Sequence, residues 1–85
     1  MVNKAYILKS DGTHIELDHK PTYDEAVEIV GGYIEFAHCP HRVTLVVDEE
    51  GRLKGKPINK VATSLYTVSP IVGDVLVLEG WRSVA

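Results

Sequence analysis

Hydrophobic and polar residues alternate along the first part of the chain in the manner of β-strands. An apolar run at residues 5–8 lies between two lysines, and Asp11-Gly12 follows, a dipeptide that favours a tight hairpin turn. Beyond this turn, Ile15 and Leu17 alternate with polar neighbours, which is the period of a half-buried strand. The pattern therefore predicts a β-hairpin over residues 4–19.

The pattern then changes to the period of a helix. Apolar residues recur at i, i+3, i+4 and i+7, namely Tyr23, Ala26, Val27 and Val30. Thr22 and Glu25 have the spacing of a capping box, in which each side chain bonds the other's backbone N–H. Gly31-Gly32 comes next, and glycine adopts the left-handed conformation that ends many helices. We therefore expect a helix that begins after Thr22 and ends at Gly31.

The remaining chain predicts further strands and a second helix. The pattern indicates strands at 33–37, 42–47 and 74–78, an extended segment at 53–56, turns at 38–41 and 48–51, and a helix at 57–66. Ile58, Val61, Ala62 and Leu65 would form the apolar face of that helix. The element order, ββαββ(β)αβ, is typical of an α+β fold. We expect a small mixed or antiparallel sheet with both short helices on one face.

Length and composition predict one small globular domain. The chain has 85 residues, which corresponds to a single domain over residues 1–85, and 45% of them are hydrophobic. A domain of this size buries only about 60% of its unfolded surface, so association with further copies would stabilise it. We therefore expect a homo-oligomer. Trp81 could either close the core or anchor a partner, and we favour a subunit contact.

Charge and cysteine content narrow the function classes and the compartment. Nine basic residues are spread among twelve acidic ones, giving a net charge of −3, which disfavours general nucleic-acid binding. Cys39 is the single cysteine, so no internal disulfide is possible and a reducing compartment is favoured. We find neither a signal peptide nor the ~20 apolar residues of a membrane span, and therefore expect a cytoplasmic protein that does not bind membranes.

Four segments, taken in order, resemble a known family. They are Gly31-Gly32-Tyr33-Ile34-Glu35, the acidic turn at 48–51, Asn59-x-x-Ala62-Thr63, and Ile71-x-Gly73-Asp74. Together they resemble a family of small domains of unknown function that bacteriophages and mobile elements frequently encode. The resemblance implies a phage origin and a role in the cytoplasm of the host. It brings no established reaction, and a role against host defences follows from it by association only.

The first candidate binding residues are Tyr33 and Glu35, which would share one face of a strand. An aromatic ring beside a carboxylate suits a nucleobase, because the ring stacks and the carboxylate accepts from an amino edge. The alternative is simpler. The glycines end the helix, and an edge strand follows whose polar face meets solvent or a second subunit.

Further candidates lie on the second helix and on the loop before it. Asn59, Thr63 and Tyr66 would form a polar stripe opposite the apolar face, able to bind the polar groups of a ligand. Alternatively, Asn59 caps the helix and the other two face water. Arg52 and Lys54, in the motif Gly51-x-x-x-Gly55, could meet a phosphate or belong to a charged hairpin turn.

Neither a metal site nor a catalytic set is predicted. His38-Cys39-x-His41 offers three donors in a tight turn, fewer than the four of a structural zinc site. No serine stands in a G-x-S-x-G setting, and no phosphate loop occurs. We therefore expect no cofactor, no metal and no enzymatic activity.

These observations favour a binding module that sequesters a nucleotide-like signal of host immunity as a homo-oligomer. Tyr33 would stack, Glu35 and Asn59 would bind polar edges, and Arg52 or Lys54 would meet phosphate. One alternative is a direct inhibitor of a host protein that uses an acidic surface, formed by Asp48, Glu49 and Glu50. Another is a small hydrolase with Glu35 or a histidine as general base, which turnover assays would distinguish.

Overall fold

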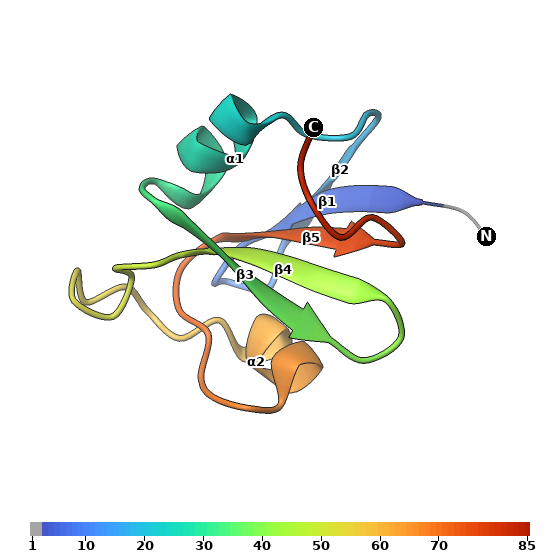
Figure 1. Cartoon of the computed structure of the whole chain (residues 1–85). Helices are drawn as coiled ribbons and strands as arrows, with labels where there is room; N and C mark the ends of the chain where they lie inside the picture. Colours follow the sequence, from blue (N-terminus) through green and yellow to red (C-terminus); the bar gives the residue numbers. More distant parts are fainter. Residues whose placement is uncertain (1–2) are drawn as a thin grey trace.

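An antiparallel sheet carries the fold. The computed structural model describes residues 3–85. These residues form five strands and two helices: β1 (Lys4–Leu8), β2 (His14–Leu17), α1 (Tyr23–Val30), β3 (Ile34–Cys39), β4 (Val43–Asp48), α2 (Lys60–Tyr66) and β5 (Val75–Glu79). The strands lie in the order β2-β1-β5-β4-β3 (Figure 1). The predicted α+β class is therefore confirmed, and the sheet is antiparallel throughout the described residues.

The sheet consists of two hairpins with the last strand between them. β1 and β2 form the predicted N-terminal hairpin, and Gly12 in its turn has a φ of 95°, which a side chain would disfavour. β3 and β4 form the second hairpin. β5 pairs with β1 on one side and β4 on the other, and its residues 75–78 are fully buried. A central strand with both faces covered must be apolar throughout, which explains the run Val-Leu-Val-Leu.

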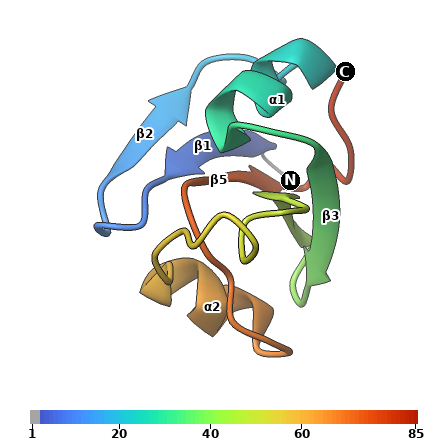
Figure 2. The same cartoon turned by 90° about the vertical axis from the view of Figure 1, so that its left-hand side faces the viewer.

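The two helices cover opposite faces of the sheet, so the expectation of one shared face was wrong. Buried residues divide into two clusters according to the alternation along the strands. Leu76 and Leu78 of β5 belong to the cluster under α1, whereas Val75 and Val77 belong to the cluster over α2. Figure 1 shows α1 above the sheet and α2 below it, and Figure 2 shows the same three layers after a 90° turn.

Helix α1 has the predicted ends. Thr22 and Glu25 form the capping box, and Gly31 is left-handed with a φ of 82°. The buried face differs slightly from the predicted one. Ala26 and Val30 are buried, but Tyr23, the first residue of the helix, is 51% exposed.

The chain before α2 is not a strand. Residues 53–55 of the segment predicted as extended form turns, Lys56 has no regular structure, and Ile58 makes an isolated bridge to Val72. Helix α2 begins at Lys60, three residues later than predicted, and Val61 is 44% exposed. The side of α2 that meets the sheet instead carries Ala62, which is fully buried.

The residues after β5 close the core on the α1 side. Trp81 and Val84 pack against the cluster under α1, and the Ala85 N–H donates to Pro21 O at 2.8 Å. The Trp81 side chain therefore packs within the domain while remaining partly exposed, and the subunit contact that we favoured for it stays a prediction.

Candidate functional site

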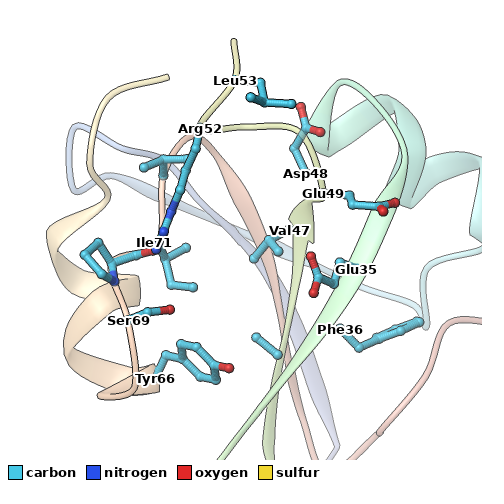
Figure 3. Close-up of a pocket in the computed structure, with 13 residues that line it drawn as sticks. Glu35, Phe36, Val47, Asp48, Glu49, Arg52, Leu53, Tyr66, Ser69 and Ile71 are labelled. Carbon is cyan, nitrogen blue, oxygen red and sulfur yellow. The ribbon is translucent and has the colours of Figure 1, made fainter. Parts of the chain in front are cut away.

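A polar-walled cleft opens on the α2 side of the sheet, between the β3–β4 hairpin and the segment that follows α2. Its volume is about 310 Å³. Ala37, Val47 and Ile71 give it an apolar floor, and polar side chains project from its rim (Figure 3). Binding sites for small ligands commonly combine an apolar lining with a few placed polar groups.

Thr63 fixes the wall of the cleft formed by the segment after α2. The chain turns at Thr67, which is left-handed with a φ of 63° and ends α2. The Thr63 hydroxyl accepts a hydrogen bond from the Ile71 N–H at 2.9 Å and donates to Ile71 O at 3.3 Å. Thr63 is therefore engaged in holding the wall, and its hydroxyl does not project into the cleft as a ligand contact.

Glu35 and Arg52 bring opposite charges into the cleft from two different elements. The alternation of β3 places Glu35 on the α2 side together with Ala37. Arg52 reaches in from the loop after β4, and its Nη2 donates to Pro70 O at 2.9 Å. A guanidinium has five N–H donors, so this bond leaves donors for a ligand. Figure 3 shows the Glu35 carboxylate and the Tyr66 hydroxyl pointing into the space from opposite sides.

Lys54, predicted beside Arg52 as a phosphate contact, is directed away from the cleft. Its Nζ lies 2.8 Å from Asp48 Oδ2 and donates to Gly31 O at 3.1 Å. Lys56 Nζ lies 2.8 Å from the same Asp48 oxygen and donates to Val30 O at 2.6 Å. Both lysines therefore neutralise Asp48 and place positive charge at the C-terminus of α1, whose own last turn has no basic residue.

The Asp48 carboxylate is the centre of this cluster, which we call the Asp48 cluster: Asp48, Lys54 and Lys56. The Asp48 side chain is 1% exposed. Burial by itself raises the pKa of this carboxyl, but hydrogen bonds from both lysines and from the Glu50 N–H outweigh burial and lower the pKa to about 2. Asp48 is consequently ionised at neutral pH, and its charge is satisfied within the fold.

Asn59, predicted to bind a ligand's polar edge, is fully buried. Its Oδ1 accepts from the Ala62 N–H at 3.1 Å and caps α2, as the alternative interpretation held. Its Nδ2 donates to Leu8 O and to Gly73 O, both at 3.0 Å. These three bonds join α2, β1 and the chain before β5, so Asn59 belongs to the core and not to the cleft.

Tyr33 lies outside the cleft, whereas Tyr66 lines it. Strand β3 begins at Ile34, and Tyr33 precedes it with 69% of its surface exposed. Tyr66 was the third residue of the predicted polar stripe, and it supplies the aromatic ring at this site. The pattern of the sequence alone offered no reason to prefer it over Tyr33, because only the return of the chain after α2 brings it opposite Glu35.

The His38-Cys39-x-His41 segment does not bring its donors together. Cys39 is buried on the α2 side, where burial raises the pKa of its thiol. His38 lies on the other face, with its ring stacked on Phe36 and its Nδ1 3.2 Å from Thr44 Oγ1. Over residues 3–85, no group of three acidic, histidine or cysteine side chains is placed to hold a metal ion.

The protein is thus a small α+β domain with a cleft in which the Glu35 carboxylate faces the Tyr66 side chain across an apolar floor. A family model described as "Domain of unknown function (DUF3846)" matches residues 3–83, and the chain belongs to that family. No curated protein and no solved structure matches the chain. In the described part of the chain, no helix has the length and apolar character needed to cross a membrane.

Proposed function

We propose that this domain is a non-enzymatic binding module that holds a small nucleotide-like anion in the cleft between β3–β4 and residues 66–72. The observation that carries the proposal is the convergence of Glu35, Arg52 and Tyr66 from three elements around one apolar floor. The fold positions the three side chains, and each one has a polar or aromatic group left for a ligand.

The chemistry of the three groups matches the parts of a nucleotide. Arg52 would bind phosphate through its remaining guanidinium donors, in charge-assisted hydrogen bonds. Glu35 would accept a hydrogen bond from an exocyclic amino group of the base. Tyr66 offers a ring on which a base can stack. A cleft of about 310 Å³ lies at the lower end of the range for small-ligand sites, which favours a mononucleotide over a larger ligand.

Binding without turnover is the form of activity that we propose. A general base needs a partner that orients it and a nucleophile within hydrogen-bond reach. The proposal does not need either, because sequestration requires affinity alone. The hydrolase alternative would use the same Glu35, so a turnover assay on the same samples distinguishes the two.

The biological setting of this proposal rests on the resemblance described above. We propose that the chain is encoded by a phage or mobile element, acts in the cytoplasm of the host, and removes a nucleotide-like signal of host immunity. We also propose that it does so as a homo-oligomer. The resemblance and the small size of the domain support these statements.

The alternative of a direct protein inhibitor is less well supported by the geometry. That alternative relied on an acidic surface at Asp48, Glu49 and Glu50. Asp48 is buried in its pair with two lysines, so only the two glutamates remain exposed. Two exposed carboxylates give little electrostatic steering towards a basic partner.

Isothermal titration calorimetry with AMP, GMP, CMP and UMP, and with inorganic phosphate as a reference, tests the proposal. At least one nucleotide should bind, and Arg52→Gln and Glu35→Gln should each weaken that binding about tenfold or more, since each removes a charge-assisted bond. Arg82→Gln and Glu28→Gln are matched controls at exposed positions outside the cleft.

Two results would contradict the proposal. One is the absence of binding by every nucleotide in the panel. The other is unchanged affinity in both cleft variants. Chromatography of the nucleotide after incubation adds the turnover test, in which an unaltered nucleotide supports sequestration and a hydrolysed one supports the enzyme alternative.

A further inference from the structure

Among residues 3–85, the backbone groups at the outer edge of β3 have no hydrogen-bond partner from another strand. β3 is the terminal strand of the sheet, on the side opposite β2 (Figure 2). The Glu49 N–H donates to Tyr33 O at 2.9 Å, which assigns Tyr33 to a hydrogen-bonded pair with β4. Because such pairs alternate along an antiparallel ladder, Ile34, Phe36 and His38 direct their N–H and C=O groups outward.

The two edges of the sheet differ in how they are protected. β2 has four residues, and short edge strands offer little to a neighbouring chain. β3 has six residues, it pairs with β4 in continuous register without a bulge, and it contains no proline and no lysine. β3 therefore lacks four of the usual devices against edge-to-edge pairing, namely a short strand, a bulge, a proline and a lysine, and Glu35 is its single charged side chain.

We propose that β3 is the dimer interface of this domain, where a second copy of the chain adds its own β3 in antiparallel orientation. The twofold axis passes through Phe36, so that Phe36 faces its counterpart and Ile34 faces His38 of the other copy. In this register all three outward-facing residues form hydrogen-bonded pairs, giving about six backbone hydrogen bonds. A shift by two residues in one direction would place Pro40 opposite Ile34 and lose an N–H donor. The same shift in the other direction would place His38 opposite Gly32, which lies outside β3.

The side chains of β3 favour a second copy over an unrelated strand. In the proposed register the only carboxylate of the strand, Glu35, faces Ala37 of the other copy, so no like charges lie directly opposite each other. Phe36 is 37% exposed, and its ring lies 6.5 Å from the His38 ring in a stacked arrangement. Pairing would cover this aromatic edge with the same rings of the second copy, and aromatic cross-strand pairs stabilise sheets.

The β3 edge would be the contact surface of the homo-oligomer in the proposed function. The dimer depends on the proposed self-association and not on nucleotide binding. Glu35 and Ala37 of β3 face the cleft. A dimer through β3 would therefore place the two clefts on the same face of one continuous sheet, on either side of the twofold axis. The nucleotide titration and the dimer test use different variants, so either one can fail without the other.

Sedimentation equilibrium of the full chain tests the interface. Two variants of opposite charge are compared, both at position 36, through which the twofold axis passes. Phe36→Lys and Phe36→Glu each place two like charges face to face in the dimer, and each should raise the dimer dissociation constant by at least about 100-fold. Mixing the two variants should restore a dimer, because lysine then faces glutamate. Ile15→Lys, an exposed apolar residue on the other edge strand, is the matched control and should leave the dimer intact.

His38→Pro is a second variant that removes an outward N–H and leaves the ladder to β4 in place. It should also weaken the dimer, which covers the case in which charge at position 36 prevents folding. Circular dichroism checks that each variant is folded. A wild-type chain that stays monomeric at every concentration would overturn the proposal. So would a dimer that persists in folded Phe36→Lys, Phe36→Glu and His38→Pro.

Discussion

The Asp48 cluster and the cleft take their positive charges from the same short loop, yet they use them in opposite ways. Lys54 and Lys56 turn towards α1, where they pair with a buried carboxylate and cap helix carbonyls. Arg52, from the same loop, turns towards the other face of the sheet and keeps donors for a ligand. A polar side chain whose hydrogen bonds are all made within the domain stabilises the fold, whereas one that keeps free donors or acceptors at a cleft can bind a ligand.

Among the polar residues whose hydrogen bonds are made within the fold, we expect substitution of Asn59 to lower stability the most. Asn59→Ala should lower the free energy of unfolding by about 3 kcal/mol, because it removes the cap of α2 and leaves two buried carbonyl groups without their donor. Urea denaturation followed by circular dichroism measures the loss. Asn59→Ser keeps a capping oxygen and should lose less. A loss below about 1 kcal/mol for the alanine variant would contradict the structural role of this side chain.

We expect substitution of Asp48 to cause the second largest loss of stability. Asp48→Asn removes the charge that pairs with Lys54 and Lys56, and should destabilise the domain by about 2 kcal/mol. The figure is below that of a fully buried pair because the lysine side chains are 39% and 24% exposed and can be hydrated. Glu50→Gln, at an exposed neighbouring position, is the control and should change stability by less than about 0.5 kcal/mol.

The stability of the domain should depend on pH through Asp48. The folded pKa of Asp48, about 2, lies below its ordinary value of 3.8. The ionised carboxylate therefore stabilises the fold fully above about pH 4, and this contribution is lost as the pH falls through about 2. Between these values the wild type should lose about 1 to 2 kcal/mol that Asp48→Asn does not lose. Parallel acid titration curves for the two proteins would show that the Asp48 pairing is not stabilising.

The smallest effect on stability is expected in the cleft. Arg52→Gln and Glu35→Gln should each change the free energy of unfolding by less than about 0.5 kcal/mol, since both side chains are exposed and neither closes a buried bond. The measurement is the same urea denaturation. Losses comparable to that of Asp48→Asn would assign the two residues to the structural framework and remove the distinction between the two regions.

Local features of the fold were predictable because their causes are local. Asp11-Gly12 indicated the first hairpin, and Thr22 with Glu25 indicated the start of α1, since turn and cap geometry depend on a few neighbouring residues. The fully apolar run in residues 75–78 indicated a buried strand. The layer arrangement was not predictable in this way. The face that a helix covers depends on how strands distant in sequence are ordered, and α1 and α2 proved to lie on opposite faces.

The candidate site was predicted only in part, for the same reason. Glu35 and Arg52 were both among the predicted binding residues, and the structure brings them into one cleft. Asn59, Thr63 and Lys54 are residue types that also bind ligands, but here their polar atoms are engaged within the fold. Tyr33 is exposed outside the cleft, and Tyr66 takes the aromatic position.

Local signals in the sequence predicted both hairpins and the ends of α1, because helix caps, hairpin turns and the periods of buried residues act over a few positions. They did not predict the turns at residues 53–55 or the start of α2 at Lys60. The tertiary structure determined which polar side chains form hydrogen bonds within the domain and which keep donors or acceptors for a ligand. A hydrogen bond such as that from Asn59 to Leu8 joins residues 51 positions apart. Whether a donor or acceptor is satisfied depends on partners at such separations, and no local pattern contains that information.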